Sequence, residues 1–107
     1  MAMHLEFVVL GSPISNQQST AAGHKNLAVW RAAVAGEAKL RWLKPRLGVD
    51  LKAIIINFYT GNKPSVDVDN MSKPILDVMQ AIVYDDDRQI RQAEFTHAEL
   101  GAVYKIA

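Results

Sequence analysis

The chain contains no cysteine, which excludes disulfide bonds, thiolate zinc sites and cysteine nucleophiles. It also lacks an apolar run of about 18 residues, so no segment is expected to span a membrane. Segment 1–6 has no basic region followed by a long apolar stretch, so we expect no signal peptide and a cytoplasmic protein. Walker-type phosphate loops and His-Glu-x-x-His zinc motifs are absent as well. These absences exclude the disulfide scaffolds and the commonest nucleotide and zinc enzymes.

The length and composition are those of one ordinary soluble domain. The chain has 107 residues, of which 50% are hydrophobic and 21% are charged, and we expect a single domain over residues 1–107. A domain of this size buries only about 60 to 65% of its unfolded surface. We therefore expect a homodimer.

Hydrophobic periodicity predicts four strands. These segments are 4–10, 51–60, 90–97 and 102–106. Segment 51–60 is apolar on both alternating faces, with Ile54, Ile55, Ile56 and Phe58, so we expect it to be the central strand, covered on both sides.

Two further segments have helical spacing. The first helix is expected to begin after Asn26 as its N-cap and to stop before Pro45, with a polar surface loop over 15–23 ahead of it. Its helical spacing is followed by Leu27, Trp30, Val34, Ala38 and Arg41, and its basic side chains are expected along an exposed flank. The second helix is expected from about Asn70 to Val83, with Pro74 tolerated in its first turn.

Charge is unevenly distributed, although the net charge is only +1. Segment 25–46 carries six basic residues against the single acidic Glu37, a local balance of +5. Segment 67–99 carries eight acidic residues against three basic ones, a balance of −5. A basic segment beside an acidic one favours a polyanion bound near a cation, and a solvated helix face is the alternative interpretation of the basic segment.

Carboxylates gather at both ends of the second predicted helix. Asp67 and Asp69 precede it, and the run 85–87 follows it. Alternate residues of an extended segment point to the same side, so Asp67 and Asp69 are expected to face a common point. Two carboxylates about 5 Å apart repel by about 3 kcal/mol at an effective dielectric of about 20, so such a cluster predicts a divalent cation. Mg²⁺, with Mn²⁺ as the alternative, prefers these hard oxygen ligands.

A polar row continues from this cluster along the second helix. At about 100° per residue, Asn70, Lys73 and Asp77 lie within about 60° of one another, opposite the apolar stripe. The helix N-terminus and Lys73 together favour a bound phosphate. An ion pair between Lys73 and Asp77, four residues apart, is the alternative interpretation.

The spacing of these residues resembles the signature of the RusA-type Holliday junction resolvases, small endonucleases often encoded by phages and prophages. The matching pattern is Asp67-x-Asp69-Asn70-x-x-Lys73-x-x-x-Asp77, followed by Asp86-Asp87-x-Gln89-Ile90. The likeness extends to segment 13–16, which is similar to the family's Pro-Ser-Asn segment except that Ile14 interrupts it.

The resemblance implies an α+β fold with a small mixed sheet and two main helices. It also implies a homodimer that binds four-way or other branched DNA and makes paired incisions in a Mg²⁺-dependent reaction. Asp67, Asp69 and Asp87 match the family's metal-binding and catalytic acids, and Lys73 matches its catalytic lysine. Asp86 matches a neighbouring acid and is a further candidate ligand, while Asp85 either extends the site or is a solvated turn residue.

Residues of the basic segment, the N-terminal loop and the closing strand are expected at the DNA. The candidate contacts are Ser15, Asn16, Lys25, Arg31, Arg41, Lys73 and His97. His97 lies where the family commonly has a basic strand residue, and an ordinary surface strand residue is the alternative.

The chemistry predicted for the site is hydrolysis of a phosphodiester. A cation held by the three acids would lower the pKa of a bound water, and Lys73 would offset the charge that builds up in the transition state. The alternative is a noncatalytic junction-binding or dimerisation module with the same fold.

Overall fold

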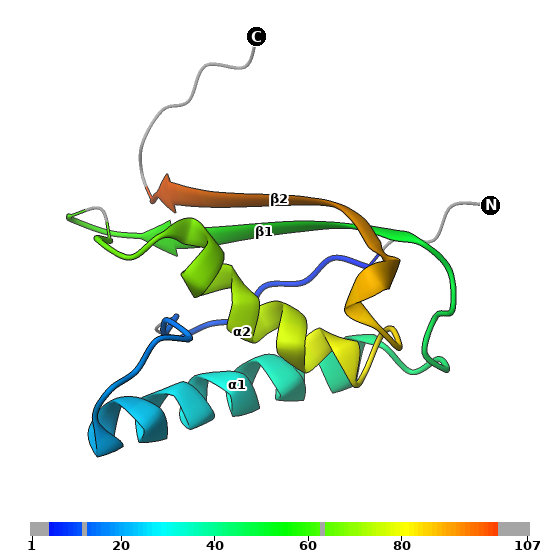
Figure 1. Cartoon of the computed structure of the whole chain (residues 1–107), viewed down its shortest axis with the longest axis horizontal. Helices are drawn as coiled ribbons and strands as arrows, with labels where there is room; N and C mark the ends of the chain where they lie inside the picture. Colours follow the sequence, from blue (N-terminus) through cyan, green and yellow to red (C-terminus); the bar gives the residue numbers. More distant parts are fainter. Residues whose placement is uncertain (1–4, 12, 63, 101–107) are drawn as a thin grey trace, which may run out of the picture.

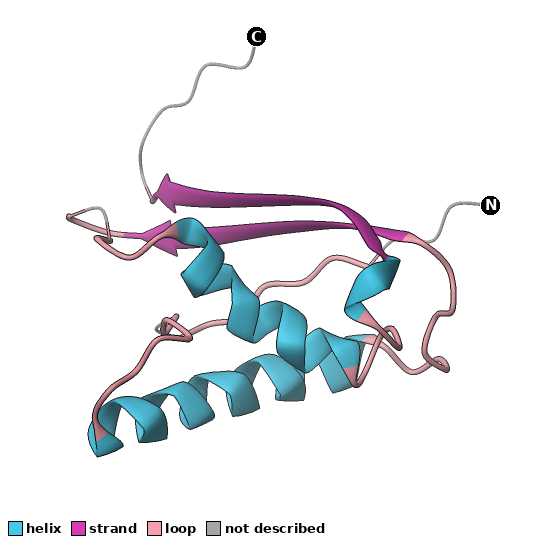
Figure 2. Ribbon diagram, in the orientation of Figure 1, coloured by secondary structure: helices cyan, strands magenta, loops and turns pink. Residues whose placement is uncertain are grey.

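The computed structural model describes residues 5–11, 13–62 and 64–100. Its elements, in chain order, are α1 (Ala21–Arg41), β1 (Leu51–Tyr59), α2 (Val68–Gln80), the short 3₁₀ helix η1 (Asp87–Gln89) and β2 (Ile90–Glu99). The two strands lie on one side, α2 packs against them, and α1 packs against α2 further from the strands (Figures 1 and 2). The α+β class is therefore confirmed, but the described residues contain two of the four expected strands.

The two strands are parallel, because α2 returns the chain to the end of the sheet where β1 began. Leu51 pairs with Ile90, and after an irregularity the register runs from Lys52 opposite Gln92 to Tyr59 opposite Glu99. The crossover therefore places the start of α2 beside the end of β1 and the acidic turn beside the start of β2 (Figure 1).

Helix α1 begins earlier than expected. Thr20 is the N-cap, and its hydroxyl oxygen accepts a hydrogen bond from the backbone N–H of Gly23 at 2.9 Å, so residues 21–23 of the expected loop are helical. The helix ends at Arg41, just ahead of Pro45. Of the five positions with helical spacing, four are buried, namely Leu27, Trp30, Val34 and Ala38, and Arg41 is exposed.

Helix α2 also begins before its expected start. Asp67 is its N-cap, so Asp69 lies in the first helical turn, and the expectation of an extended segment joining Asp67 to Asp69 is wrong. Pro74 lies beyond the first turn and is fully buried. Because proline has no backbone N–H, the carbonyl of Asn70 loses its helical donor. The backbone N–H of Asn16 donates to that carbonyl at 2.9 Å and so joins the N-terminal loop to α2.

The segment expected as the first strand alternates between half-buried and exposed residues but pairs with no strand among the described residues. Leu5, Phe7 and Val9 are half-buried, while the residues between them are exposed, and residues 5–10 are irregular. Leu5 packs against a core cluster of Trp42, Val83 and Tyr84. The expected strand over 102–106 lies outside the described residues.

The expectation that β1 is covered on both sides is wrong for the described part of the chain. Ile54, Ile56 and Phe58 are 58%, 47% and 50% exposed, while Ile55 and Asn57 are buried. Both helices lie on the same side of the sheet, which leaves the outer face of β1 uncovered by described residues (Figure 2). The strand is apolar on both faces, yet the described chain provides only one covering layer.

Candidate active site

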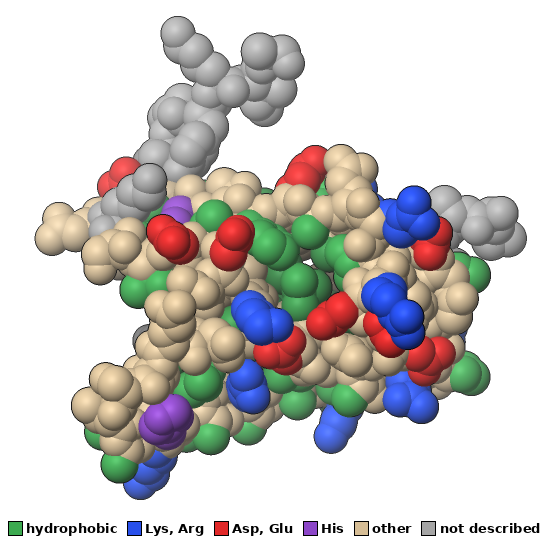
Figure 3. Space-filling model, in the orientation of Figure 1, with side chains coloured by type: hydrophobic (Ala, Val, Ile, Leu, Met, Phe, Trp, Pro, Cys, Tyr) green, Lys and Arg blue, Asp and Glu red, His purple; other side chains and the backbone are tan. Residues whose placement is uncertain are grey.

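Helix α2 and η1 together form a hollow of about 260 Å³ beside the sheet. Its charged lining residues are Asp69, Lys73 and Asp77 from α2 and Asp87 from η1. Its apolar lining residues are Leu76, Ile90 and Phe95. Figure 3 shows acidic side chains on both sides of an apolar patch in the middle of this face. The structure thus brings together Asp69, Asp87 and Lys73, which the sequence pattern predicts to act together.

Two of the predicted metal ligands do not line this hollow. Asp67 is exposed at the start of α2, and its carboxylate makes no capping hydrogen bond. Asp86 instead caps η1. Within the described ranges, no three His or acidic side chains form a group close enough to hold a metal ion. The metal role of these acids stays a prediction.

Arg88 donates three hydrogen bonds to the carboxylate of Asp86. One carboxylate oxygen accepts from the backbone N–H of Arg88 at 2.8 Å, and the guanidinium bonds to both oxygens at 3.2 and 3.1 Å. These hydrogen bonds, first those from the side chain, lower the pKa of Asp86. The structure therefore gives Asp86 a role in shaping the turn.

Gln89 holds the acidic turn in place, a role that its position in the sequence motif does not reveal. Its amide oxygen accepts from the backbone N–H groups of Asp85 and Asp86 at 2.9 and 2.8 Å. Its amide nitrogen donates to the carbonyls of Leu47 and Val49 at 2.7 and 2.9 Å. A single side chain therefore joins the acidic turn to the segment that leads into β1.

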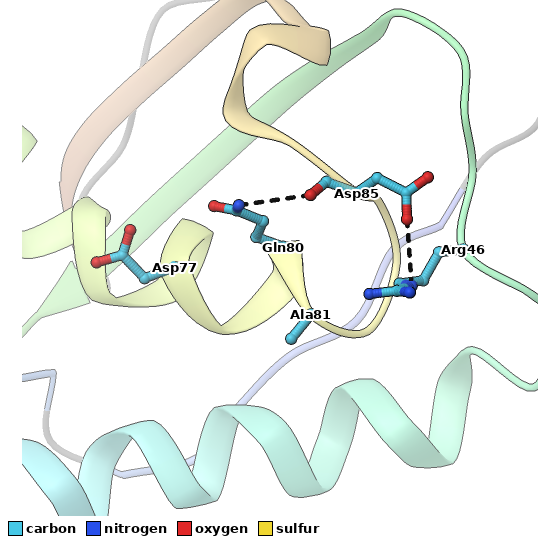
Figure 4. A pocket seen from close by; sticks show the side chains of 5 residues that line it. All are labelled: Arg46, Asp77, Gln80, Ala81 and Asp85. Carbon is cyan, nitrogen blue, oxygen red and sulfur yellow. Dashed lines mark hydrogen bonds and ion pairs between the residues drawn. The ribbon is translucent and has the colours of Figure 1, made fainter.

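Asp85 faces a second hollow, of about 410 Å³, next to the first. Figure 4 shows its carboxylate meeting Arg46, at 3.2 Å, while the Gln80 amide reaches the Asp85 carbonyl at 3.4 Å. Asp77 lines both hollows. Asp85 thus makes an exposed ion pair, in keeping with the interpretation of it as a turn residue.

Tyr84 is a buried residue that sequence analysis did not single out. Its hydroxyl lies 3.0 Å from the Leu76 carbonyl and 3.4 Å from an oxygen of Asp87. Burial, followed by the charge of Asp87, raises the pKa of Tyr84, so the phenol remains a hydrogen-bond donor. The only signal in the sequence is an aromatic residue directly ahead of the acidic run.

Lys73 makes the ion pair with Asp77 that was the alternative interpretation of this row. Its ammonium nitrogen lies 3.3 Å from one oxygen of Asp77, and Arg31 of α1 lies 3.5 Å from the other. Arg31 also donates to the side-chain oxygen of Asn16 at 3.0 Å. The paired Lys73 side chain is still 54% exposed and lines the hollow.

The other predicted DNA contacts differ in exposure. Lys25 and Arg41 are exposed on α1, where Arg41 lies 3.7 Å from Glu37. Ser15 is buried, and its hydroxyl accepts from the backbone N–H of Gln17 at 3.1 Å. The N-terminal loop is thus built against the protein, with Asn16 bound to both helices.

His97 lies on β2 and is half-buried beside the start of α2, and its role as a DNA contact stays a prediction. Its Nε2 lies 3.1 Å from the carbonyl oxygen of Val66, directly ahead of Asp67. Its neighbour on β1 is Asn57, which is buried and donates to the hydroxyl of Ser72 at 3.2 Å. Polar side chains under the helix therefore fix the first turn that carries Asp69.

Comparison with known families adds one match. A family model described as endodeoxyribonuclease RusA matches residues 13–103. Comparisons with curated proteins and with solved structures gave no match. The matched span contains every residue that lines the first hollow. In the part of the chain that the structure describes, no helix is long and apolar enough to cross a membrane.

Proposed function

The chain belongs to the RusA endodeoxyribonuclease family, and from this premise we propose that it is a Mg²⁺-dependent homodimeric nuclease that resolves four-way DNA junctions in the cytoplasm by paired incisions. The family match implies Holliday junction resolvase activity. The observation that carries the finer proposal is the shared hollow of Asp69, Asp87 and Lys73. In this arrangement, the two carboxylates suit a metal cation, and the ammonium group of Lys73 suits a phosphate.

The donor set of the hollow fits a hard divalent cation. Mg²⁺ in proteins is commonly bound by one or two carboxylates together with water and substrate phosphate, and Asp69 and Asp87 provide two. We propose that they hold Mg²⁺ or Mn²⁺, with Asp67 beside them at the helix start and Asp86 as a further candidate. Such a cation supplies a bound water of lowered pKa and offsets phosphate charge.

In this proposal, Lys73 stabilises the transition state at the scissile phosphate. Its ammonium group lines the same hollow as the acids and is more than half exposed. Negative charge increases on the phosphate oxygens during attack, and a fixed cation beside them lowers the barrier. Positive residues of α1, with Lys25 and Arg41 exposed, would bind the DNA backbone.

The face of β1 that no described residue covers supports the homodimer. Ile54, Ile56 and Phe58 are exposed in a row on one face of a strand, which is costly in water. We propose that a second copy of the chain covers this face. A two-fold axis would then present two identical sites to the symmetry-related strands of a junction.

A cleavage assay tests the proposal. The purified chain, with Mg²⁺, should cut a synthetic four-way junction at paired positions and should leave linear duplex of the same sequence intact, while Asp87→Asn should not cut. Junction binding without cleavage in Mg²⁺ or Mn²⁺ would instead establish the noncatalytic module. Sedimentation should give a dimer, and a monomer at working concentration contradicts that part.

A salt titration tests the predicted DNA surface. Affinity for the junction should fall with salt at a log-log slope of about −0.9 per neutralised phosphate. Lys25→Ala and Arg41→Ala should each reduce the slope by about one unit if the side chain contacts a phosphate. A slope near zero for the wild type would contradict an electrostatic interface along α1.

A further inference from the structure

Asp77 forms ion pairs with two basic side chains that come from different helices. Lys73, on the same helix, lies 3.3 Å from one of its oxygens, and Arg31 of α1 lies 3.5 Å from the other. The Asp77 side chain is 30% exposed, the least exposed of the three. One carboxylate therefore stands between two positive charges beside the hollow.

Arg31 is itself held by the N-terminal loop. The side-chain oxygen of Asn16 accepts from its guanidinium at 3.0 Å. The backbone of Asn16 is in turn bound to the Asn70 carbonyl, which Pro74 leaves without a helical donor. A continuous series of polar contacts thus runs from the loop through Arg31 and Asp77 to Lys73.

This arrangement decides how much positive charge Lys73 presents to the hollow. Paired with Asp77 alone, the ammonium group would be neutralised by a close carboxylate and drawn toward it. With Arg31 on the other oxygen, the three side chains carry a net charge of +1, and the hold of Asp77 on Lys73 is weaker. A phosphate entering the hollow then competes for Lys73 more easily.

We propose that Arg31 is a positioning residue that neutralises Asp77 and so leaves the Lys73 ammonium group available to the scissile phosphate. The inference rests on the proposed nuclease function and deepens it. It differs from the expectation that Arg31 contacts DNA directly, because its effect passes through Asp77.

Single-turnover cleavage at saturating enzyme, together with junction binding at several salt concentrations, tests the inference. Arg31→Gln should slow cleavage about tenfold and leave the salt slope of binding unchanged. Asp77→Asn alone should stay within about threefold of the wild type, because it removes the group that retains Lys73. The double variant should recover to the rate of Asp77→Asn, and Arg31→Lys should lie between Arg31→Gln and the wild type.

Arg91→Gln is the matched control. It removes an arginine that is paired with a carboxylate, that of Asp50 at 3.4 Å, and Arg91 is not among the residues that line the hollow. Its cleavage rate and salt slope should equal those of the wild type. Circular dichroism and thermal melting should confirm that each variant is folded.

Three results would overturn the inference. A salt slope reduced by about one unit with a normal saturated rate would make Arg31 a direct phosphate contact. A slow Arg31→Gln variant that Asp77→Asn does not restore would make its role purely structural. If Arg31→Gln does not fold, the Asp77→Asn variant alone decides. A cleavage rate reduced 100-fold or more in that variant would contradict the idea that Asp77 holds Lys73 back from the phosphate. Wild-type protein that binds but never cleaves would instead remove the proposed function, and this inference with it.

Discussion

The two acidic segments beside the hollow are held in opposite ways. At the start of α2, the Asp67 carboxylate makes no capping bond, and the backbone is positioned from beneath by His97 on Val66 and by Asn57 on Ser72. In the turn 85–87, the acids themselves are bonded. Arg46 pairs with the Asp85 carboxylate, Arg88 donates to that of Asp86, and the Tyr84 hydroxyl donates to that of Asp87. Gln89 accepts from the backbone N–H groups of the turn.

Because of this difference, the two segments are expected to contribute differently to catalysis and to folding stability. An exposed carboxylate that makes no capping hydrogen bond contributes little to folding, so its replacement should change activity alone. A carboxylate inside a hydrogen-bonded turn contributes to both, because its removal leaves donors without partners. The two segments should therefore respond differently to equally conservative substitutions.

The largest effect is expected from Asp67→Asn. Asparagine is as good an N-cap as aspartate, so the helix start and the thermal midpoint should be nearly unchanged. If Asp67 is a metal ligand, junction cleavage should fall by at least about 100-fold while junction binding persists. Cleavage at the wild-type rate in Mg²⁺ would show that this exposed acid has no part in the reaction.

Lys73, which lies between the two segments, should give the next largest effect. Lys73→Ala should raise the barrier of the chemical step by about 2 to 4 kcal/mol, with a smaller change in junction affinity. Stability should change little, because an exposed ion pair such as that with Asp77 contributes at most about 1 kcal/mol. A changed dissociation constant with normal single-turnover cleavage would identify Lys73 as a binding residue.

Gln89→Ala tests how much the hydrogen bonds of the acidic turn 85–87 contribute to stability. It removes bonds to four backbone groups, and we expect the free energy of unfolding to fall by about 1 to 3 kcal/mol in urea titrations. Cleavage should also fall, because Asp87 follows directly on the residues that Gln89 holds. Gln92→Ala, at an exposed position of β2, is the matched control. Equal stability of the two variants would contradict the proposed clamp.

Tyr84→Phe should give the smallest effect, and one with a distinct pH dependence. Loss of the hydroxyl leaves the ring packed and should cost about 1 kcal/mol at neutral pH. The pKa of Tyr84 is raised in the folded chain, so the unfolded chain loses its proton first, near pH 10. Wild-type stability should therefore decline above about pH 10 more steeply than that of the variant, as chemical denaturation at pH 8 and pH 10.5 can measure. Parallel declines would show that the hydroxyl is not held in its neutral form.

Features that depend on regular residue spacing could be predicted from the sequence. The buried stripe of α1 and the grouping of Asp69, Lys73 and Asp87 both follow from residue spacing. Helix starts were not, because Thr20 and Asn26 are both good N-caps, as are Asp67 and Asn70. Side-chain pattern alone does not decide between two good N-caps that lie three to six residues apart.

The contacts that shape the site were beyond sequence reasoning for a different reason. Gln89 binds carbonyls of Leu47 and Val49, and Asn16 binds the carbonyl of Asn70. Every residue has a carbonyl, so such acceptors leave no mark in the sequence. Similarly, an isoleucine-rich strand has the same pattern whether its second face is covered by its own chain or by another.

The parallel pairing of β1 with β2 sets the order of events during synthesis. Leu51 pairs with Ile90, so the ribosome makes β1 about 40 residues before it makes the partner strand. At ordinary translation rates this interval is about 2 to 8 s. A hairpin would find its partner in microseconds. For those seconds an isoleucine-rich strand lacks its β2 partner, and an unpaired strand of this composition is prone to aggregate.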